Sequence, residues 1–277
     1  MLNYNYIISG ASDKAIHVDL TTSDIKKATP LVIFVHGFKG FKDWGTHNFV
    51  AGYFAQQGLD FLKFNFSHNG ISKDGSDQFN DLEGFATNTF SKELFDLNQV
   101  IDFAVSEEKF VKPSHIYLIG HSLGGGISII HTAENRIIEK LATWASISSF
   151  RNLWSIEQEK IWKENKVLYF ANSRTNQQMP IYSTLLEDLN RNYERLNILS
   201  SAKRISQPWL IIHGEEDPAV NYNHAQELHK QQINSKLMLI KNGDHVFGAK
   251  HPWEESELPD ALRCVCDATI AFFKNNT

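Results

Sequence analysis

The sequence has little cysteine and lacks long apolar runs, and each lack excludes a class of protein. Its two cysteines, Cys264 and Cys266, are too few for a metal framework and too close together for an ordinary disulfide. We expect both to be free thiols near a C-terminal helix. No apolar run approaches the roughly 18 residues of a membrane helix, so no membrane span is predicted. The N-terminal residues lack the basic start and apolar core of a signal peptide, and we expect a cytoplasmic protein.

Clusters of basic charge and cofactor motifs are also missing. The chain has 27 basic and 32 acidic residues, a net charge of −5, and no Lys/Arg cluster that would follow a phosphate backbone. Its twelve histidines include no H-E-x-x-H spacing, and no G-x-G-x-x-G or P-loop motif is present. We therefore expect no nucleic-acid partner, no metal and no cofactor, and no oligomeric state is predicted.

Short apolar segments alternate with helical patterns along the 277 residues. Such segments, covered on both faces, are typical of a mainly parallel sheet. The predicted strands are residues 31–35, 61–66, 115–119, 141–147, 209–212 and 237–240. Apolar residues recur at helical spacing between Phe90 and Ala104, behind a candidate cap at Asn88 or Thr89. This alternation predicts an α/β fold with a doubly wound sheet.

One segment interrupts the alternation. Residues 149–201 are rich in Trp, Tyr, Asn, Arg and Glu and contain no obvious strand. We expect a helical cap that covers the end of the sheet, inserted between two parts of one core, residues 1–148 and 202–277.

The stretch Gly120-His121-Ser122-Leu123-Gly124 joins a predicted strand to a predicted helix and fits the G-x-S-x-G nucleophile elbow. A tight turn of this kind favours small flanking residues and exposes the serine hydroxyl at the edge of the sheet where ligands bind. The pattern therefore predicts that Ser122 is a nucleophile.

A serine nucleophile needs a base and a carboxylate that orients the base. Asp217 follows one predicted strand and His245 follows the next, in the order serine, acid, histidine. Glu215 and Glu216 stand beside Asp217 as alternative acids, whereas Asp244 is better explained by turn formation. We predict a catalytic triad of Ser122, His245 and Asp217.

The same site needs hydrogen-bond donors for an oxyanion. The backbone N–H of Leu123 and that of Phe38, which follows another predicted strand, are the candidates. His36 is expected to hold the Phe38 loop through hydrogen bonds, or to be purely structural. His121 is expected to point away from the serine hydroxyl.

These motifs resemble a serine hydrolase of the α/β-hydrolase superfamily. The resemblance rests on His36-Gly37-Phe38, on Gly120 to Gly125, on His213-Gly214 leading to Asp217, and on Gly243-Asp244-His245. It is similar above all to the dienelactone-hydrolase and serine-aminopeptidase-like branch and to capped feruloyl esterases. The resemblance implies the α/β-hydrolase fold and the triad, and leaves the substrate open.

The predicted function is hydrolysis of a small carboxylic ester through an acyl-enzyme. Two alternatives remain: an aminopeptidase-like serine peptidase, with Glu157, Glu159 and Glu164 as a possible acidic subsite, and a non-catalytic binding protein of the same fold. Apolar side chains of the cap could line a substrate pocket or pack the cap itself. These side chains are Trp154, Trp162, Tyr169, Phe170, Met179 and Tyr182.

Overall fold

A central sheet of eight strands organises the described part of the chain, which in this computed structural model comprises residues 1–72, 78–106, 109–172 and 175–275. The strand order is β1-β2-β4-β3-β5-β6-β9-β10. Strand β2 pairs antiparallel with β1 and β4, and the remaining pairs are parallel. The strands are β1 (Leu2–Ser9), β2 (Ala15–Thr22), β3 (Leu31–Val35), β4 (Asp60–Phe64), β5 (Ile116–His121), β6 (Ile138–Trp144), β9 (Trp209–Gly214) and β10 (Lys236–Ile240).

The predicted doubly wound, mainly parallel sheet is confirmed, and the antiparallel pair β1/β2 is an addition to it. All six predicted strands are present: residues 31–35 coincide with β3, and the other five differ from the prediction at one or both ends. Strand β1 alternates exposed and half-buried positions at the edge of the sheet, so its sequence has none of the continuous apolar character of the interior strands.

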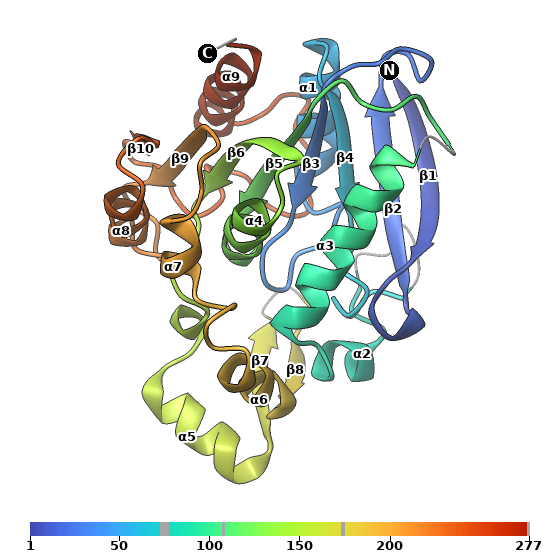
Figure 1. Cartoon of the computed structure of the whole chain (residues 1–277). Coiled ribbons are helices and arrows are strands. Elements are labelled where there is room, and N and C mark those ends of the chain that lie inside the picture. Colours follow the sequence, from blue (N-terminus) through green and yellow to red (C-terminus); the bar gives the residue numbers. More distant parts are fainter. Residues whose placement is uncertain (73–77, 107–108, 173–174, 276–277) are drawn as a thin grey trace.

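Helices cover both faces of the sheet, as Figure 1 shows. Helices α1 (His47–Gln56) and α9 (Asp260–Lys274) pack on one face. The other face carries α3 (Phe90–Val105), α4 (Leu123–Glu134), α7 (Ile198–Ala202) and α8 (Asn223–Gln231). Each face has its own core of buried apolar residues. Two short elements, a 3-10 turn (Ala11–Asp13) and α2 (Leu82–Ala86), complete this part of the chain.

Helix α3 follows the predicted pattern. Its N-cap is Thr89, whose side chain accepts a hydrogen bond from the N–H of Lys92. The apolar residues that recur at helical spacing are buried, namely Phe90, Leu94, Leu97, Val100, Ile101 and Ala104, whereas Phe95 on the opposite face is exposed. Helix α9 carries the two cysteines, both free, with Cys264 exposed and Cys266 buried. The expectation of free thiols on a C-terminal helix is confirmed.

Within the segment 149–201, the elements from the 3-10 turn to α6 lie beyond the carboxyl ends of the parallel strands, at the lower edge of Figure 1. It contains a 3-10 turn (Phe150–Leu153), α5 (Ile156–Asn165), β7 (Val167–Asn172), β8 (Gln177–Tyr182) and α6 (Thr184–Arg191). The expectation that this segment has no strand is wrong, because β7 and β8 pair antiparallel. Leu168, Met179 and Ile181 of this pair are buried in the same core as the sheet. The boundaries 149 and 201 stay a prediction.

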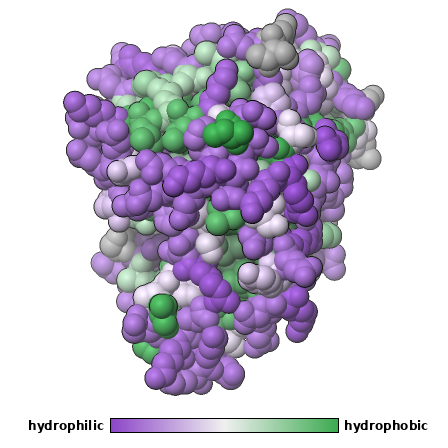
Figure 2. Space-filling model, turned by 60° about the vertical axis from the view of Figure 1, so that its left-hand side comes forward, coloured by the Kyte–Doolittle hydropathy of each residue, from purple (hydrophilic) through white to green (hydrophobic). Residues whose placement is uncertain are grey.

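The surface is mainly hydrophilic on the face shown in Figure 2, where apolar residues form separate patches. Among the described residues, no helix is both long enough and apolar enough to cross a membrane.

Candidate active site

Ser122 lies at a sharp turn between β5 and α4. Its backbone has φ 56° and ψ −118°, a left-handed conformation that is strained for a residue with a Cβ. The N–H of Ser122 donates to the carbonyl oxygen of Trp144, 2.9 Å away, which fixes the turn to β6. A Cβ on Gly124 would overlap the carbonyl oxygen of Val35, and one on Gly120 would lie 2.5 Å from the carbonyl oxygen of Gly124. The two glycines of the motif are thus required by close backbone packing.

Asp217 and His245 meet although they follow different strands. Asp217 is in the loop after β9 and His245 in the loop after β10, and His245 Nδ1 lies 2.8 Å from Asp217 Oδ2. The other carboxylate oxygen, Oδ1, accepts hydrogen bonds from the backbone N–H groups of Ala219 and Val220, each at 2.8 Å. Glu215 and Glu216 are exposed, whereas the side chain of Asp217 is fully buried.

His213 is a second imidazole partner of Asp217 that the sequence analysis did not identify. Its Nε2 lies 2.8 Å from the carbonyl oxygen of Val220 and 3.2 Å from Asp217 Oδ2. Because a carbonyl only accepts, Nε2 carries the proton. Burial alone would raise the pKa of Asp217, but the hydrogen bonds from His213 and His245 hold it well below its usual range. Asp217 is therefore an anion at neutral pH.

His121, next to the serine, contacts the His245 loop. Its Nε2 donates to the backbone carbonyl oxygen of His245 at 2.9 Å, and the two rings are 4.9 Å apart between centroids. Burial, and then the neighbouring His245, lower the pKa of His121 to about 3. His121 is a neutral donor that holds the loop.

The loop after β3 approaches the serine from the other side. A Cβ on Gly37 would lie 3.0 Å from the Cβ of Ser122. His36 Nδ1 donates to the carbonyl oxygen of Gly37 at 2.9 Å, and His36 Nε2 accepts from the N–H of Phe66 at 3.3 Å. Burial lowers the pKa of His36 to about 4, so the ring is neutral and holds the loop as expected.

Two backbone donors remain free beside Ser122. In the described ranges, no hydrogen bond uses the N–H of Phe38 or that of Leu123. Within the same ranges the Ser122 hydroxyl has no hydrogen-bond partner, and no hydrogen bond joins it to His245. The predicted serine and histidine nevertheless line the same pocket.

A buried ion cluster fixes the chain that follows this loop. Lys42 Nζ lies 2.7 Å from both Asp19 and Asp43. Lys63 Nζ lies 2.6 Å from Asp19 and 2.5 Å from Asp43. Both lysines are almost fully buried, and the cluster joins the loop to β2 and β4. Local sequence patterns did not indicate it.

The segment 149–201 contacts the same loop. The Phe38 ring packs edge-on against Phe170 of β7, with centroids 5.1 Å apart. On the core side it lies at a tilt to the Phe85 ring, 5.7 Å away. Lys39 Nζ donates to the carbonyl oxygen of Ala171 at 2.9 Å. Strand β7 thus contacts the loop that carries the free N–H of Phe38.

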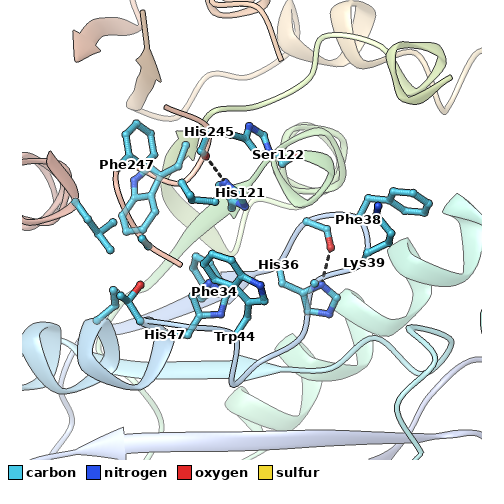
Figure 3. A pocket seen from close by; sticks show the side chains of 18 residues that line it. Phe34, His36, Phe38, Lys39, Trp44, His47, His121, Ser122, His245 and Phe247 are labelled. Atoms are coloured by element: carbon cyan, nitrogen blue, oxygen red, sulfur yellow. Dashed lines mark hydrogen bonds between the residues drawn. The ribbon is translucent and has the colours of Figure 1, made fainter. Parts of the chain in front are cut away.

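Ser122 and His245 open onto a cavity of about 200 Å³, shown in Figure 3. Aromatic side chains of the core form much of its wall, including Phe34, Trp44, Trp144 and Phe247. The remaining lining residues are His36, Gly37, Phe38, Lys39, Gly40, Thr46, His47, Val50, His121, Val246, Ala249 and Leu262.

The pocket residues predicted from residues 149–201 lie elsewhere. Trp154 and Trp162 line a smaller hollow with Phe38 and Leu123. Met179 is buried and Tyr169 is exposed. The hydroxyl of Tyr182 donates to Glu83 at 2.8 Å. In the ranges that the structure covers, no three His, Cys, Asp or Glu side chains are grouped to hold a metal ion.

Comparisons with known proteins show the family and the fold of the chain. Residues 53–259 match the model of the prolyl oligopeptidase family. The uncharacterized protein YfhR of Escherichia coli is 22% identical over 236 residues, which cover 83% of this chain and 69% of that protein, in both O157:H7 and K12.

Solved structures are similar over nearly the full length. Est1E from Butyrivibrio proteoclasticus is 21% identical to this chain, with a TM-score of 0.71. The alignment covers 97% of each of the two chains. A second structure of Est1E contains ferulic acid. The esterase domain of a Rhodothermus marinus protein is 17% identical, covers 98% of each chain and has a TM-score of 0.67.

Proposed function

Because the chain belongs to the prolyl oligopeptidase family and has the predicted α/β-hydrolase fold, we propose that it is a serine hydrolase that cleaves carboxylic esters. It is a hydrolase of this fold with esterases and peptidases among its relatives. One observation supports the triad most strongly: His245 Nδ1 lies 2.8 Å from a buried Asp217, in the wall of the pocket that contains Ser122.

The proposed reaction begins with attack by Ser122 Oγ on the ester carbonyl. Nδ1 of His245 donates to Asp217, so its Nε2 has a lone pair that can take the serine proton. We propose that the hydrogen bond between Ser122 Oγ and His245 Nε2 forms when substrate is bound. Catalytic hydrogen bonds are often long in the free enzyme and shorten in the substrate complex. His245 then gives the proton to the leaving alcohol, and water hydrolyses the acyl-enzyme in the same way.

The N–H groups of Phe38 and Leu123 are the proposed donors to the tetrahedral oxyanion. Neither N–H has a partner in the described part of the chain, so neither loses a hydrogen bond when it binds the oxyanion. Each donor of this kind lowers the barrier by about 3 kcal/mol. Ser122 also precedes the N-terminus of α4, whose dipole favours negative charge at the same place.

The composition of the pocket favours an ester over a peptide. An aminopeptidase needs an acidic group for the substrate ammonium, and none of the residues that line the cavity is Asp or Glu. Glu159 already binds Arg151 and Lys163, and Glu157 and Glu164 are exposed. The family match is the observation that keeps a serine peptidase as the second candidate.

The test is a matched pair of substrates, an ester and an amide of the same short acyl group, assayed with the wild-type protein and Ser122→Ala. We expect ester hydrolysis that the substitution abolishes and a much lower kcat/KM for the amide. A higher kcat/KM for the amide would identify a peptidase. Turnover of neither substrate by folded protein would favour a binding module.

A further inference from the structure

His213 lies inside the sheet next to the candidate triad. It is the penultimate residue of β9, its side chain is fully buried, and its Nε2 faces two acceptors. The carbonyl oxygen of Val220 lies 2.8 Å from Nε2, and Asp217 Oδ2 lies 3.2 Å from it. Nδ1 is buried without a partner among the described residues, so a proton there would have no acceptor. His213 is therefore the tautomer whose one N–H lies between Val220 and Asp217.

The carboxylate of Asp217 has a donor for each of its lone pairs. Oδ1 accepts from the N–H groups of Ala219 and Val220, and Oδ2 lies 2.8 Å from His245 Nδ1 as well as 3.2 Å from His213 Nε2. A carboxylate has about four acceptor positions, so all of them are used. The donors other than His245 belong to the strand end and the turn that carry Asp217. They leave one lone pair, on Oδ2, for His245.

Two imidazole N–H groups thus share the Oδ2 atom. When His245 takes a proton, Asp217 stabilises the imidazolium that forms. A hydrogen bond to a carboxylate stabilises its negative charge, so the bond from His213 weakens the attraction of Asp217 for that imidazolium. His245 should therefore keep the free lone pair that catalysis needs down to a lower pH.

The other titratable groups around His245 are bonded elsewhere. His121 of β5 donates to the backbone of the His245 loop, Asp244 accepts from two backbone N–H groups, and His224 of α8 contacts a serine hydroxyl. Among the described residues, none of these three side chains has a hydrogen bond to Asp217 or to the His245 ring. The other charged side chains of the two loops and of the facing side of α8 are exposed, namely Glu215, Glu216, Lys241 and Glu227.

We propose that His213 is a positioning residue that shares Asp217 Oδ2 with His245 and thereby extends the activity of the site to lower pH. This inference rests on the proposed function, in which His245 is the base that must be unprotonated.

The test compares two substitutions of His213 that differ in one hydrogen-bond donor. Gln and Met have unbranched side chains of similar size, and the Gln amide has N–H groups where Met has none. We expect the acid limb of kcat/KM against pH to move to higher pH by about one unit in His213→Met. In His213→Gln it should stay near its wild-type position. KM should change little in both variants, because His213 is not among the residues that line the cavity.

An acid limb at the same pH in all three proteins would overturn the role of His213. A lower kcat in His213→Met without this shift would have the same meaning, because a distorted turn alone would lower kcat.

An NMR titration tests the shared oxygen without catalysis. In wild-type protein with isotopically labelled histidine, the Nε2–H resonance of His213 should shift at the pH at which the His245 ring takes up a proton, because both rings contact Oδ2. The resonance is assigned by its absence from His213→Gln. If it does not move as His245 is protonated, the proposal is wrong, and this result does not depend on whether His213→Met folds.

The outcomes separate this proposal from the proposed function. If the folded wild-type protein hydrolyses no ester, the proposed function fails, and the NMR titration still decides whether His213 and His245 share Asp217. Ester hydrolysis that Ser122→Ala abolishes, with no shift of the acid limb in His213→Met, would overturn the role of His213 alone.

Discussion

The His121 imidazole donates its Nε2 proton to the backbone carbonyl oxygen of His245, 2.9 Å away, although 124 positions separate the two residues. The residue before the candidate nucleophile thus holds the loop of the candidate base. A pKa of about 3 makes the His121 ring a weak base, and its Nε2 proton is held in the bond to the His245 loop.

His121→Phe should lower kcat about 100-fold with little change in KM, because a displaced His245 no longer meets Ser122 correctly. His121→Gln keeps an N–H donor and should restore most of the activity. The measurements are kcat and KM for a short ester and the rate of fluorophosphonate labelling. Equal activity of the Phe and Gln variants would contradict this positioning role.

Asp217→Asn should lower kcat about 10⁴-fold without unfolding the protein, because an amide disturbs the tautomer of His245. Glu215→Gln and Glu216→Gln are the matched controls, since both side chains are exposed. They should change kcat less than threefold, in keeping with the small effects of surface substitutions. A larger decrease of kcat in either control would indicate that this residue, and not Asp217, is the carboxylate of the triad.

The contact between Phe38 and Phe170 predicts that residues 149–201 affect the proposed oxyanion donor, the N–H of Phe38. Phe170→Leu removes the edge-on contact at 5.1 Å and should lower kcat about tenfold. Tyr169→Leu changes the adjacent, 56% exposed residue of the same strand and should have little effect. Similar kcat values for the two variants would show that the loop does not depend on this contact.

Glu93 should make stability depend on pH. Burial raises the pKa of this carboxyl to about 8, although a hydrogen bond from Asn88 lowers it in part. The other oxygen, Oε2, has no partner among the described residues. A raised pKa means that the contribution of this group is fully present below about pH 4.3, the usual value for Glu, and is lost as pH rises towards 8.

Glu93→Gln does not titrate, so its stability relative to the wild-type protein should increase steadily from pH 5 to pH 8. Urea unfolding at three pH values measures this difference. Glu157→Gln, at an exposed position, should show no such trend. A difference between Glu93→Gln and the wild-type protein that does not vary with pH would contradict the raised pKa.

The elbow could be predicted because its requirements are local. A strand, a tight turn and a helix must follow one another, and Gly120 and Gly124 are the small residues that the close backbone contacts demand. The sequence positions of Asp217 and His245 after consecutive strands predicted their approach in the same way, since such loops share one edge of the sheet.

The pocket could not be predicted in this way. Phe34, His47 and Leu262 come from three distant segments, and only the packing of α1 and α9 on the sheet brings them together. The bond from His213 to Asp217 likewise depends on how the turn after β9 closes. The aromatic residues of 149–201 were conspicuous in the sequence, yet Trp154 and Trp162 line a separate hollow.

Intact-mass analysis after fluorophosphonate treatment tests the central claim most directly. The matched control is Ser148→Ala, because the Ser148 hydroxyl also contacts a histidine and a carboxylate, His224 at 2.8 Å and Glu227 at 2.7 Å. We predict one adduct on the wild-type protein and on Ser148→Ala, and none on Ser122→Ala. An adduct that persists in Ser122→Ala, or that vanishes in Ser148→Ala, would contradict the assignment of Ser122 as the nucleophile.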